Sequence, residues 1–244
     1  MKLSVIGASG TFPVAGHPAT GFLIEQASTR VWCDAGPGTF VALPVDPDLV
    51  DAVVISHQHP DHCLDLITAF HAFRYRPEPR GGMPVYAPAA VIEKLRDFVD
   101  NPEINETFDF QPTTGGDSIE IGAITVTFAW TDHSVPTLGS RWEANNRVLA
   151  YSADTGPGGD WKELAKDADL FLSEASYQGD MADYGYQQHL TAAIAGEIAR
   201  SQGARRLMLT HIPPYLDKTQ SVAEAEKVFD RPVELAVPGT TRKI

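Results

Sequence analysis

The chain has 244 residues, 43% of them hydrophobic, and its 32 acidic against 19 Lys and Arg residues give a net charge of −13. This length and composition predict one domain, residues 1–244, that buries its core without disulfides, and the acidic balance argues against a protein that grips a long nucleic acid. No apolar stretch nears the ~20 residues that cross a bilayer, and two isolated cysteines without a secretion signal predict a reduced, cytoplasmic protein.

Strand-like runs rich in Val, Ile, Leu and Thr recur along the chain, and amphipathic patterns lie between some of them. In chain order we expect strands at 2–6, 20–25, 30–34 and 52–56, a helix at 62–73, a strand at 84–87 and a helix at 89–100. Residues 101–116 are the most irregular and are interpreted as a surface connection.

The second half continues with strands at 118–121, 124–130 and 147–151, a helix at 161–168, a strand at 170–173, a helix at 191–202, a strand at 206–210, a helix at 221–229 and a strand at 233–236. Thr191 is placed to open the 191–202 helix and Gly203 to close it. This mixture predicts a layered α/β architecture with mixed sheets.

A cluster of metal-ligand residues follows the strand at 52–56. His57, His59, Asp61 and His62 lie within six positions, and Pro60 suits the first turn of a helix that would carry Asp61 and His62. Imidazole and carboxylate groups suit Zn²⁺ and similar ions, and four ligands this close would crowd one metal. The spacing therefore predicts two adjacent ions.

Further candidate ligands stand just past the ends of other predicted strands. His133 follows 124–130, Asp154 follows 147–151 and His211 follows 206–210. Taken alone, each has an ordinary structural explanation, but ligands in open α/β sheets gather at the carboxyl ends of strands. We therefore expect all three at one rim with the first cluster, and we expect His17 and His71 not to be ligands.

The pattern His-x-His-x-Asp-His, followed by a distant His, an Asp and a final His, resembles the metallo-β-lactamase superfamily. The resemblance runs from Asp34 to His211 and implies an αβ/βα sandwich of two mixed β-sheets flanked by helices, with the site at one edge. It implies the following assignment: His57, His59 and His133 on one metal, Asp61, His62 and His211 on the other, Asp154 bridging both and Asp34 supporting the site from behind.

The closer resemblance is to the ribonuclease Z-like phosphodiesterase branch. It lies in Leu172–Ser176 and in His189-Leu190-Thr191, where that branch reads His-Glu-Ala-Thr and His-Ser-Thr; Ser173 replaces the first histidine. The resemblance implies that Glu174 and His189 assist proton transfer to the leaving group. The end of the first cluster and the segment after His211 are similar to short actinobacterial atypical cyclic-nucleotide phosphodiesterases.

These features predict a metal-dependent hydrolase in which Asp61, Glu174 and His189 are catalytic. A hydroxide shared by two divalent ions, zinc or alternatively manganese or iron, would attack a small phosphodiester, with a 3′,5′-cyclic nucleotide giving the 5′-monophosphate. Alternatives are a transfer-RNA 3′ endonuclease and a carboxyl-ester, lactone or thioester hydrolase. A non-catalytic sensor would not need a proton donor. The resemblance also implies a possible homodimer, and the lack of a long apolar stretch predicts no membrane partner.

Two weaker features leave their role open. The loop 7–11, Gly-Ala-Ser-Gly-Thr, could present backbone N–H groups to phosphate or could be a tight turn. Tyr177, Tyr215 and Trp142 are candidates for stacking on a base, with a core or surface position as the alternative.

Overall fold

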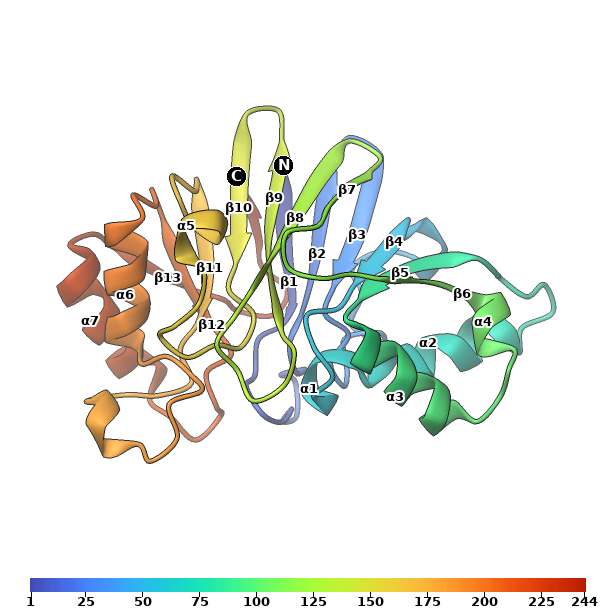
Figure 1. The fold of residues 1–244 in the computed structure, drawn as a ribbon, viewed down its shortest axis with the longest axis horizontal. Helices are drawn as coiled ribbons and strands as arrows, with labels where there is room; N and C mark the ends of the chain where they lie inside the picture. Colours follow the sequence, from blue (N-terminus) through green and yellow to red (C-terminus); the bar gives the residue numbers. More distant parts are fainter.

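Two seven-stranded sheets face each other and carry helices on both outer faces in the computed structural model, which describes residues 1–244 (Figure 1). The first sheet has the order β14-β1-β2-β3-β4-β5-β6. Its strands are β14 (Thr241–Lys243), β1 (Lys2–Gly7), β2 (Gly21–Gln26), β3 (Thr29–Cys33), β4 (Ala52–Val54), β5 (Met83–Ala87) and β6 (Phe108–Pro112). The first four pair antiparallel, and β3 to β6 pair parallel.

The second sheet repeats this division, with the order β13-β12-β11-β10-β9-β8-β7. Its strands are β7 (Ser118–Ile121), β8 (Ile124–Trp130), β9 (Leu138–Ala144), β10 (Arg147–Tyr151), β11 (Leu170–Glu174), β12 (Leu207–Thr210) and β13 (Val233–Leu235). Strands β7 to β10 pair antiparallel, whereas β10 to β13 pair parallel. The predicted αβ/βα sandwich with two mixed sheets is confirmed.

Three apolar cores hold these layers together. One lies between the sheets and includes Phe22, Trp142 and Tyr151, and the other two lie under the helices on each side. The helices are α1 (Pro60–Cys63), α2 (Asp65–Arg74), α3 (Ala89–Val99), α4 (Ile104–Thr107), α5 (Trp161–Leu164), α6 (Ala192–Ser201) and α7 (Lys218–Phe229), with short 3₁₀ turns η1 (Pro47–Leu49) and η2 (Met181–Asp183). No helix is long and apolar enough to cross a bilayer.

The two edges of the sandwich differ. The β2–β3, β7–β8 and β9–β10 hairpins turn at the upper edge in Figure 1, and the loops that follow β4, β8, β10 and β12 emerge at the lower edge. At that lower edge the N–H of Leu138 donates to the carbonyl of Ser56, which ties the two sheets together. Ligands carried by separate strands can therefore meet there.

The structure differs from the sequence-based elements in several places. The helix expected at 161–168 is only the short α5, Trp161–Leu164, which ends at Ala165. Residues 101–116 are not a plain surface connection, because they contain α4 and β6. Strands β9 and β14 were not predicted. In β9, buried and half-buried positions alternate only from Ser140 on, and Gly139, Ser140 and Arg141 weaken an apolar pattern. The expected helix at 62–73 is divided into α1 and α2 at Leu64.

Candidate metal centre

The turn after β4 and the loops after β8 and β10 form a first cluster of ligand atoms. The Nδ1 atom of His59 lies 3.0 Å from Nε2 of His57 and 3.1 Å from Nε2 of His133. Oδ2 of Asp154 lies 3.7 Å from Nε2 of His57 and 3.9 Å from Nε2 of His133. All four ligand atoms lie within 4.8 Å of one another.

A second cluster shares Asp154 with the first. The Nε2 atoms of His62 and His211 are 3.1 Å apart, and Oδ2 of Asp61 is 3.1 Å from Nε2 of His211. Oδ1 of Asp154 lies 3.2 Å from Nε2 of His62 and 3.4 Å from Nε2 of His211. Asp154 thus presents one carboxylate oxygen to each cluster. Every residue predicted as a ligand from the sequence is brought to this place.

Both clusters fit divalent cations. Ligands about 2.0–2.1 Å from one zinc ion lie roughly 3.3 Å from each other in a tetrahedron, which matches the spacings seen here. Oδ1 of Asp154 is buried without a hydrogen-bond partner. His62 Nδ1 lies 2.8 Å from Asp34 and donates to it, so the lone pair of its Nε2 faces other acceptors. A cation satisfies all of these atoms at once.

The electrostatics of the clusters also favour cations. Burial alone would lower the pKa of His62, yet the charges of Asp154, Asp61 and Asp34 raise it well above its usual value. Burial would raise the pKa of Asp154, but His211 and His62 hold it well below its usual range. A carboxylate-rich, buried field of this kind attracts positive charge. Burial lowers the pKa of His57 and favours the neutral ring that a metal ligand needs, whereas a cation at the second cluster would displace the proton that the surrounding carboxylates favour on His62.

Asp34 holds the second cluster from behind, as the resemblance implied. Its Oδ2 accepts hydrogen bonds from Nδ1 of His62 (2.8 Å), the hydroxyl of Ser56 (2.9 Å) and the hydroxyl of Tyr151 (2.8 Å). Its Oδ1 accepts the backbone N–H of Ser56 at 2.8 Å. The carboxylate therefore fixes the tautomer and orientation of His62.

His189 stands beside the clusters and is paired with Glu174. Its Nδ1 lies 2.9 Å from Oε1 of Glu174 and 4.0 Å from Oδ2 of Asp154. Burial lowers the pKa of His189, but the charge and hydrogen bond of Glu174 more than offset this and raise it to about 9. Because Glu174 takes Nδ1 and 23% of the side chain is exposed, Nε2 is the nitrogen available to a bound molecule.

The loop 7–11 serves the clusters through its backbone. The N–H of Thr11 donates to Oδ2 of Asp61 at 2.9 Å, and a Cβ on Gly10 would lie 2.3 Å from the carbonyl oxygen of His211, so only glycine fits there.

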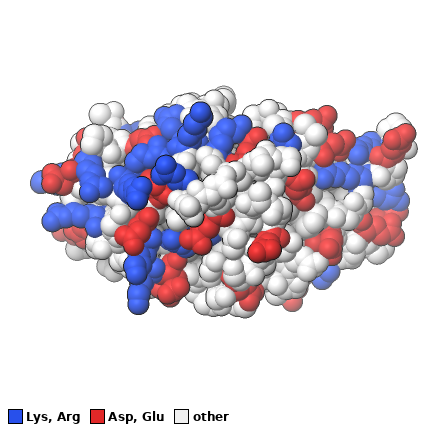
Figure 2. Space-filling model, turned by 90° about the horizontal axis from the view of Figure 1, so that it is seen from above, with Lys and Arg blue, Asp and Glu red and all other residues white.

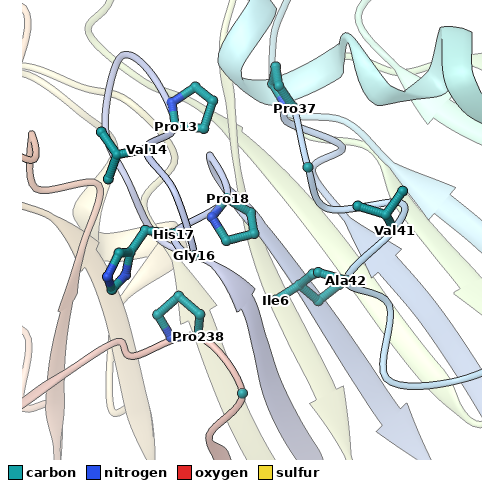
Figure 3. Close-up of a pocket in the computed structure, with 12 residues that line it drawn as sticks. Ile6, Pro13, Val14, Gly16, His17, Pro18, Pro37, Val41, Ala42 and Pro238 are labelled. Atoms are coloured by element: carbon teal, nitrogen blue, oxygen red, sulfur yellow. The ribbon is translucent and has the colours of Figure 1, made fainter.

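Residues of the segment 13–18, which follows this loop, line an apolar groove of about 510 Å³. His17 and Pro18 are among its lining residues, and no ligand of either cluster is (Figure 3). His17 lies in that groove, as expected for a non-ligand.

The three aromatic candidates have different positions. Trp142 has the core position that was the alternative to base stacking. It is fully buried between the sheets, and its indole N–H donates to the hydroxyl of Ser140. Tyr177 meets the ring of His189 edge-on at 5.5 Å and stacks on Tyr184 at 3.9 Å. Tyr215 is 74% exposed.

Several contacts at the site were not predicted. Ser56 and Tyr151 hold Asp34, and the hydroxyl of Ser176 lies 2.8 Å from Nδ1 of His211. The carbonyl of Gln188 accepts from Nδ1 of His133 at 2.9 Å. A signal existed only for Ser56 and Ser176, which stand next to or near ligand motifs in the sequence. A backbone carbonyl has no sequence signature.

Comparison with known proteins agrees with this geometry. Residues 29–212 match the family model described as the β-lactamase superfamily domain. An uncharacterized protein of Mycobacterium tuberculosis, Rv1339, is 32% identical and covers 100% of this chain and 92% of its own length. The probable metallo-hydrolase YhfI of Bacillus subtilis is 30% identical over 98% of both chains, and a crystal structure of YhfI superposes with a TM-score of 0.88 at 26% identity, covering 99% of this chain and 98% of that chain.

A ribonuclease Z of Archaeoglobus fulgidus is 22% identical over 95% of this chain and 94% of its own length. The family match, the fold and the paired His/Asp clusters agree with one another. This chain is a metal-dependent hydrolase that belongs to the metallo-β-lactamase superfamily.

Proposed function

We propose that this protein hydrolyses the phosphodiester of a small substrate, a 3′,5′-cyclic nucleotide, to the 5′-monophosphate. The observation that carries the proposal is the Glu174–His189 pair beside the ligand clusters. A histidine oriented by a carboxylate is suited to give a proton to a leaving alkoxide. A site that acted on activated esters or thioesters would have less need of such a donor.

Two divalent cations would occupy the clusters, with zinc the expected metal and manganese or iron the alternatives. We assign His57, His59 and His133 to one cation and Asp61, His62 and His211 to the other, with Asp154 between them. When bound, such a pair supplies Lewis acidity and makes hydroxide available near neutral pH.

The residues of the chain then have distinct tasks. Thr11 and Asp34 keep Asp61 and His62 in place through the hydrogen bonds described above. Water adds across the scissile bond: its oxygen joins phosphorus and gives one proton to solvent, the P–O3′ bond breaks, and O3′ takes a proton from Nε2 of His189. His189 then regains a proton from solvent, so that the net change is the addition of one water molecule. Glu174 holds Nδ1 of that ring, so that Nε2 points away from the carboxylate.

An aromatic surface beside His189 supports a substrate with a planar base. Tyr177 is held between the edge of the His189 ring and the face of Tyr184, and its hydroxyl donates to the carbonyl of Tyr186. Tyr186 and Tyr215 are exposed. Tyrosine faces stack on nucleobases without strong base preference.

The charge of the chain supports a small substrate over transfer RNA. A net charge of −13 opposes binding that depends on neutralising several phosphates. On the hairpin face, opposite the ligand clusters, Lys and Arg gather toward one end and are mixed with acids (Figure 2). The basic side chains seen there lie on the wrong edge of the molecule to guide an RNA to the clusters.

The test is hydrolysis of 3′,5′-cyclic AMP by purified protein with zinc and with manganese, beside a metal-stripped control. We expect metal-dependent release of 5′-AMP. Cleavage of bis(p-nitrophenyl) phosphate without any 5′-AMP would keep the phosphodiester chemistry and discard cyclic nucleotides. No turnover of either compound by metal-loaded protein would refute the proposal and favour ester and thioester substrates.

A further inference from the structure

One buried hydroxyl, that of Ser176, connects the two parts of the proposed site. Ser176 follows β11, is 5% exposed, and has three polar neighbours within reach of its Oγ. Oε2 of Glu174 is 2.7 Å away, Nδ1 of His211 is 2.8 Å away, and the carbonyl oxygen of His211 is 3.1 Å away. The backbone N–H of Ser176 also donates to Oε2 of Glu174, at 3.2 Å.

The hydroxyl has a single proton, and the contacts decide where it goes. The shortest contact joins Oγ of Ser176 to Oε2 of Glu174. An ionised carboxylate oxygen has no proton to donate, so the Ser176 hydroxyl must donate to Glu174. Oγ is then an acceptor toward His211, and Nδ1 of His211 must be the donor. The hydrogen bonds therefore run from His211 to Ser176 to Glu174.

This direction determines the state of the other ring nitrogen. A neutral imidazole with a proton on Nδ1 has its lone pair on Nε2, the atom that lies 3.1 Å from Oδ2 of Asp61 and 3.1 Å from Nε2 of His62. A metal ligand needs that lone pair, and a partner on the opposite nitrogen fixes it. Asp34 does the same for His62 directly, whereas His211 contacts its carboxylate only through Ser176.

Glu174 also makes contacts on its other oxygen. Oε1 accepts Nδ1 of His189 at 2.9 Å and the backbone N–H of Thr155, the residue after Asp154, at 2.7 Å. One carboxylate thus holds the proposed proton donor directly and His211 through Ser176. His211 has a φ of +53°, a backbone conformation that residues with a side chain rarely adopt, and it therefore needs support from its surroundings.

We propose that Ser176 is a positioning residue that holds His211 in its ligating tautomer and joins it to the carboxylate that orients His189. The inference rests on the proposed ligand role of His211, and not on the identity of the substrate. Because Ser176 touches no reacting atom, its effect is on cation binding at the second cluster.

The test compares Ser176→Ala with two matched variants. Ser176→Thr keeps the hydroxyl, and Ser173→Ala removes a neighbouring buried hydroxyl on β11 that bonds only the Glu174 carbonyl. Zinc affinity is measured by competition with a chromophoric chelator. We expect Ser176→Ala to bind one of two zinc ions about 10- to 100-fold more weakly, with Ser173→Ala close to the wild type and Ser176→Thr restoring affinity.

A second readout follows the tautomer itself. Histidine side-chain ¹H–¹⁵N spectra of the zinc-loaded protein should show a solvent-protected Nδ1–H of His211, absent in Ser176→Ala. Wild-type zinc affinity with that signal retained in Ser176→Ala would overturn the proposal, as would an equal loss in Ser173→Ala. Two tightly bound zinc ions in His211→Ala would show that His211 is not a ligand, and the proposal would then be wrong. None of these measurements uses a substrate, so failure of cyclic-nucleotide hydrolysis is a separate result.

Discussion

Replacing Asp34 with Asn should weaken both the metal centre and the fold. Asn can still accept the backbone N–H of Ser56 on its carbonyl oxygen, but its NH₂ group would replace Oδ2. Oδ2 accepts from His62, the Ser56 hydroxyl and Tyr151, at 2.8–2.9 Å. Two amide protons would then face three donors in a fully buried position.

The magnitude follows from these contacts. Leaving buried donors without an acceptor costs about 1–3 kcal/mol each, less what relaxation recovers, so we expect a loss of roughly 2–4 kcal/mol in the free energy of unfolding. For a chain of this size this lowers Tm by roughly 4–16 °C. His62 also loses the partner that fixes its tautomer, which should weaken zinc binding about 10- to 100-fold, or ~1.4–2.7 kcal/mol.

Thermal unfolding of the metal-stripped protein and chelator competition for zinc separate the two effects. Tyr151→Phe is the matched control, because it removes one donor to Asp34 and leaves the carboxylate and its bond to His62. We expect it to bind zinc like the wild type and to lose at most about 1–2 kcal/mol. Asp34→Asn protein with unchanged Tm and two tightly bound zinc ions would refute the reasoning.

The other predictions concern two carboxylates, Asp154 and Asp169, and one histidine, His189. Asp154→Ala should abolish turnover and lower the zinc content measured by atomic emission together, since it presents one oxygen to each cluster; full metal content with activity would contradict its shared role. His189→Ala should lower kcat about 10²- to 10⁴-fold with both zinc ions retained, and loss of metal would instead make it a ligand. Asp169→Asn should destabilise the fold by about 1–2 kcal/mol at pH 7, because Asp169 accepts the N–H of Val148 at 2.9 Å and pairs with Arg147. Burial would raise the pKa of Asp169, but these partners lower it, so its stabilisation is present above the ordinary carboxyl pKa near ~4 and is lost as pH falls through the lowered pKa. Urea unfolding should therefore show the difference shrinking below about pH 4, and a constant difference would contradict the ionic origin.

Part of the site could be predicted because its signal is local. His57, His59, Asp61 and His62 stand within six positions, and Pro60 begins α1 as expected. His133, Asp154 and His211 could be added because each follows a recognisable strand, and strand ends share an edge. Glu174 and His189 came from a family resemblance, and their 2.9 Å hydrogen bond gives that pair a structural basis.

The fold was predicted where periodicity was clear and missed where it was weak. Thr191 accepts the N–H of Ile194 at the start of α6, and Gly203 takes a φ of +73° after its end, both as the sequence indicated. Strand β6 was not predicted because its residues show no clear alternation, and it is its parallel pairing with β5 that makes this segment a strand. Pairing of this kind depends on a neighbour distant in the chain.

By itself, the sequence determined the class of the protein: its ligand types, their spacing and the strand ends that carry them are local features of the chain. Only the tertiary structure decided how the ligands are held. Ser56, Tyr151 and Ser176 are ordinary residues in the sequence, and their roles come from buried hydroxyls meeting Asp34, Glu174 and His211. The physical reason is that a hydrogen bond needs atoms within about 3 Å, and residues that are 117 positions apart, such as Tyr151 and Asp34, reach that distance only after both sheets have packed.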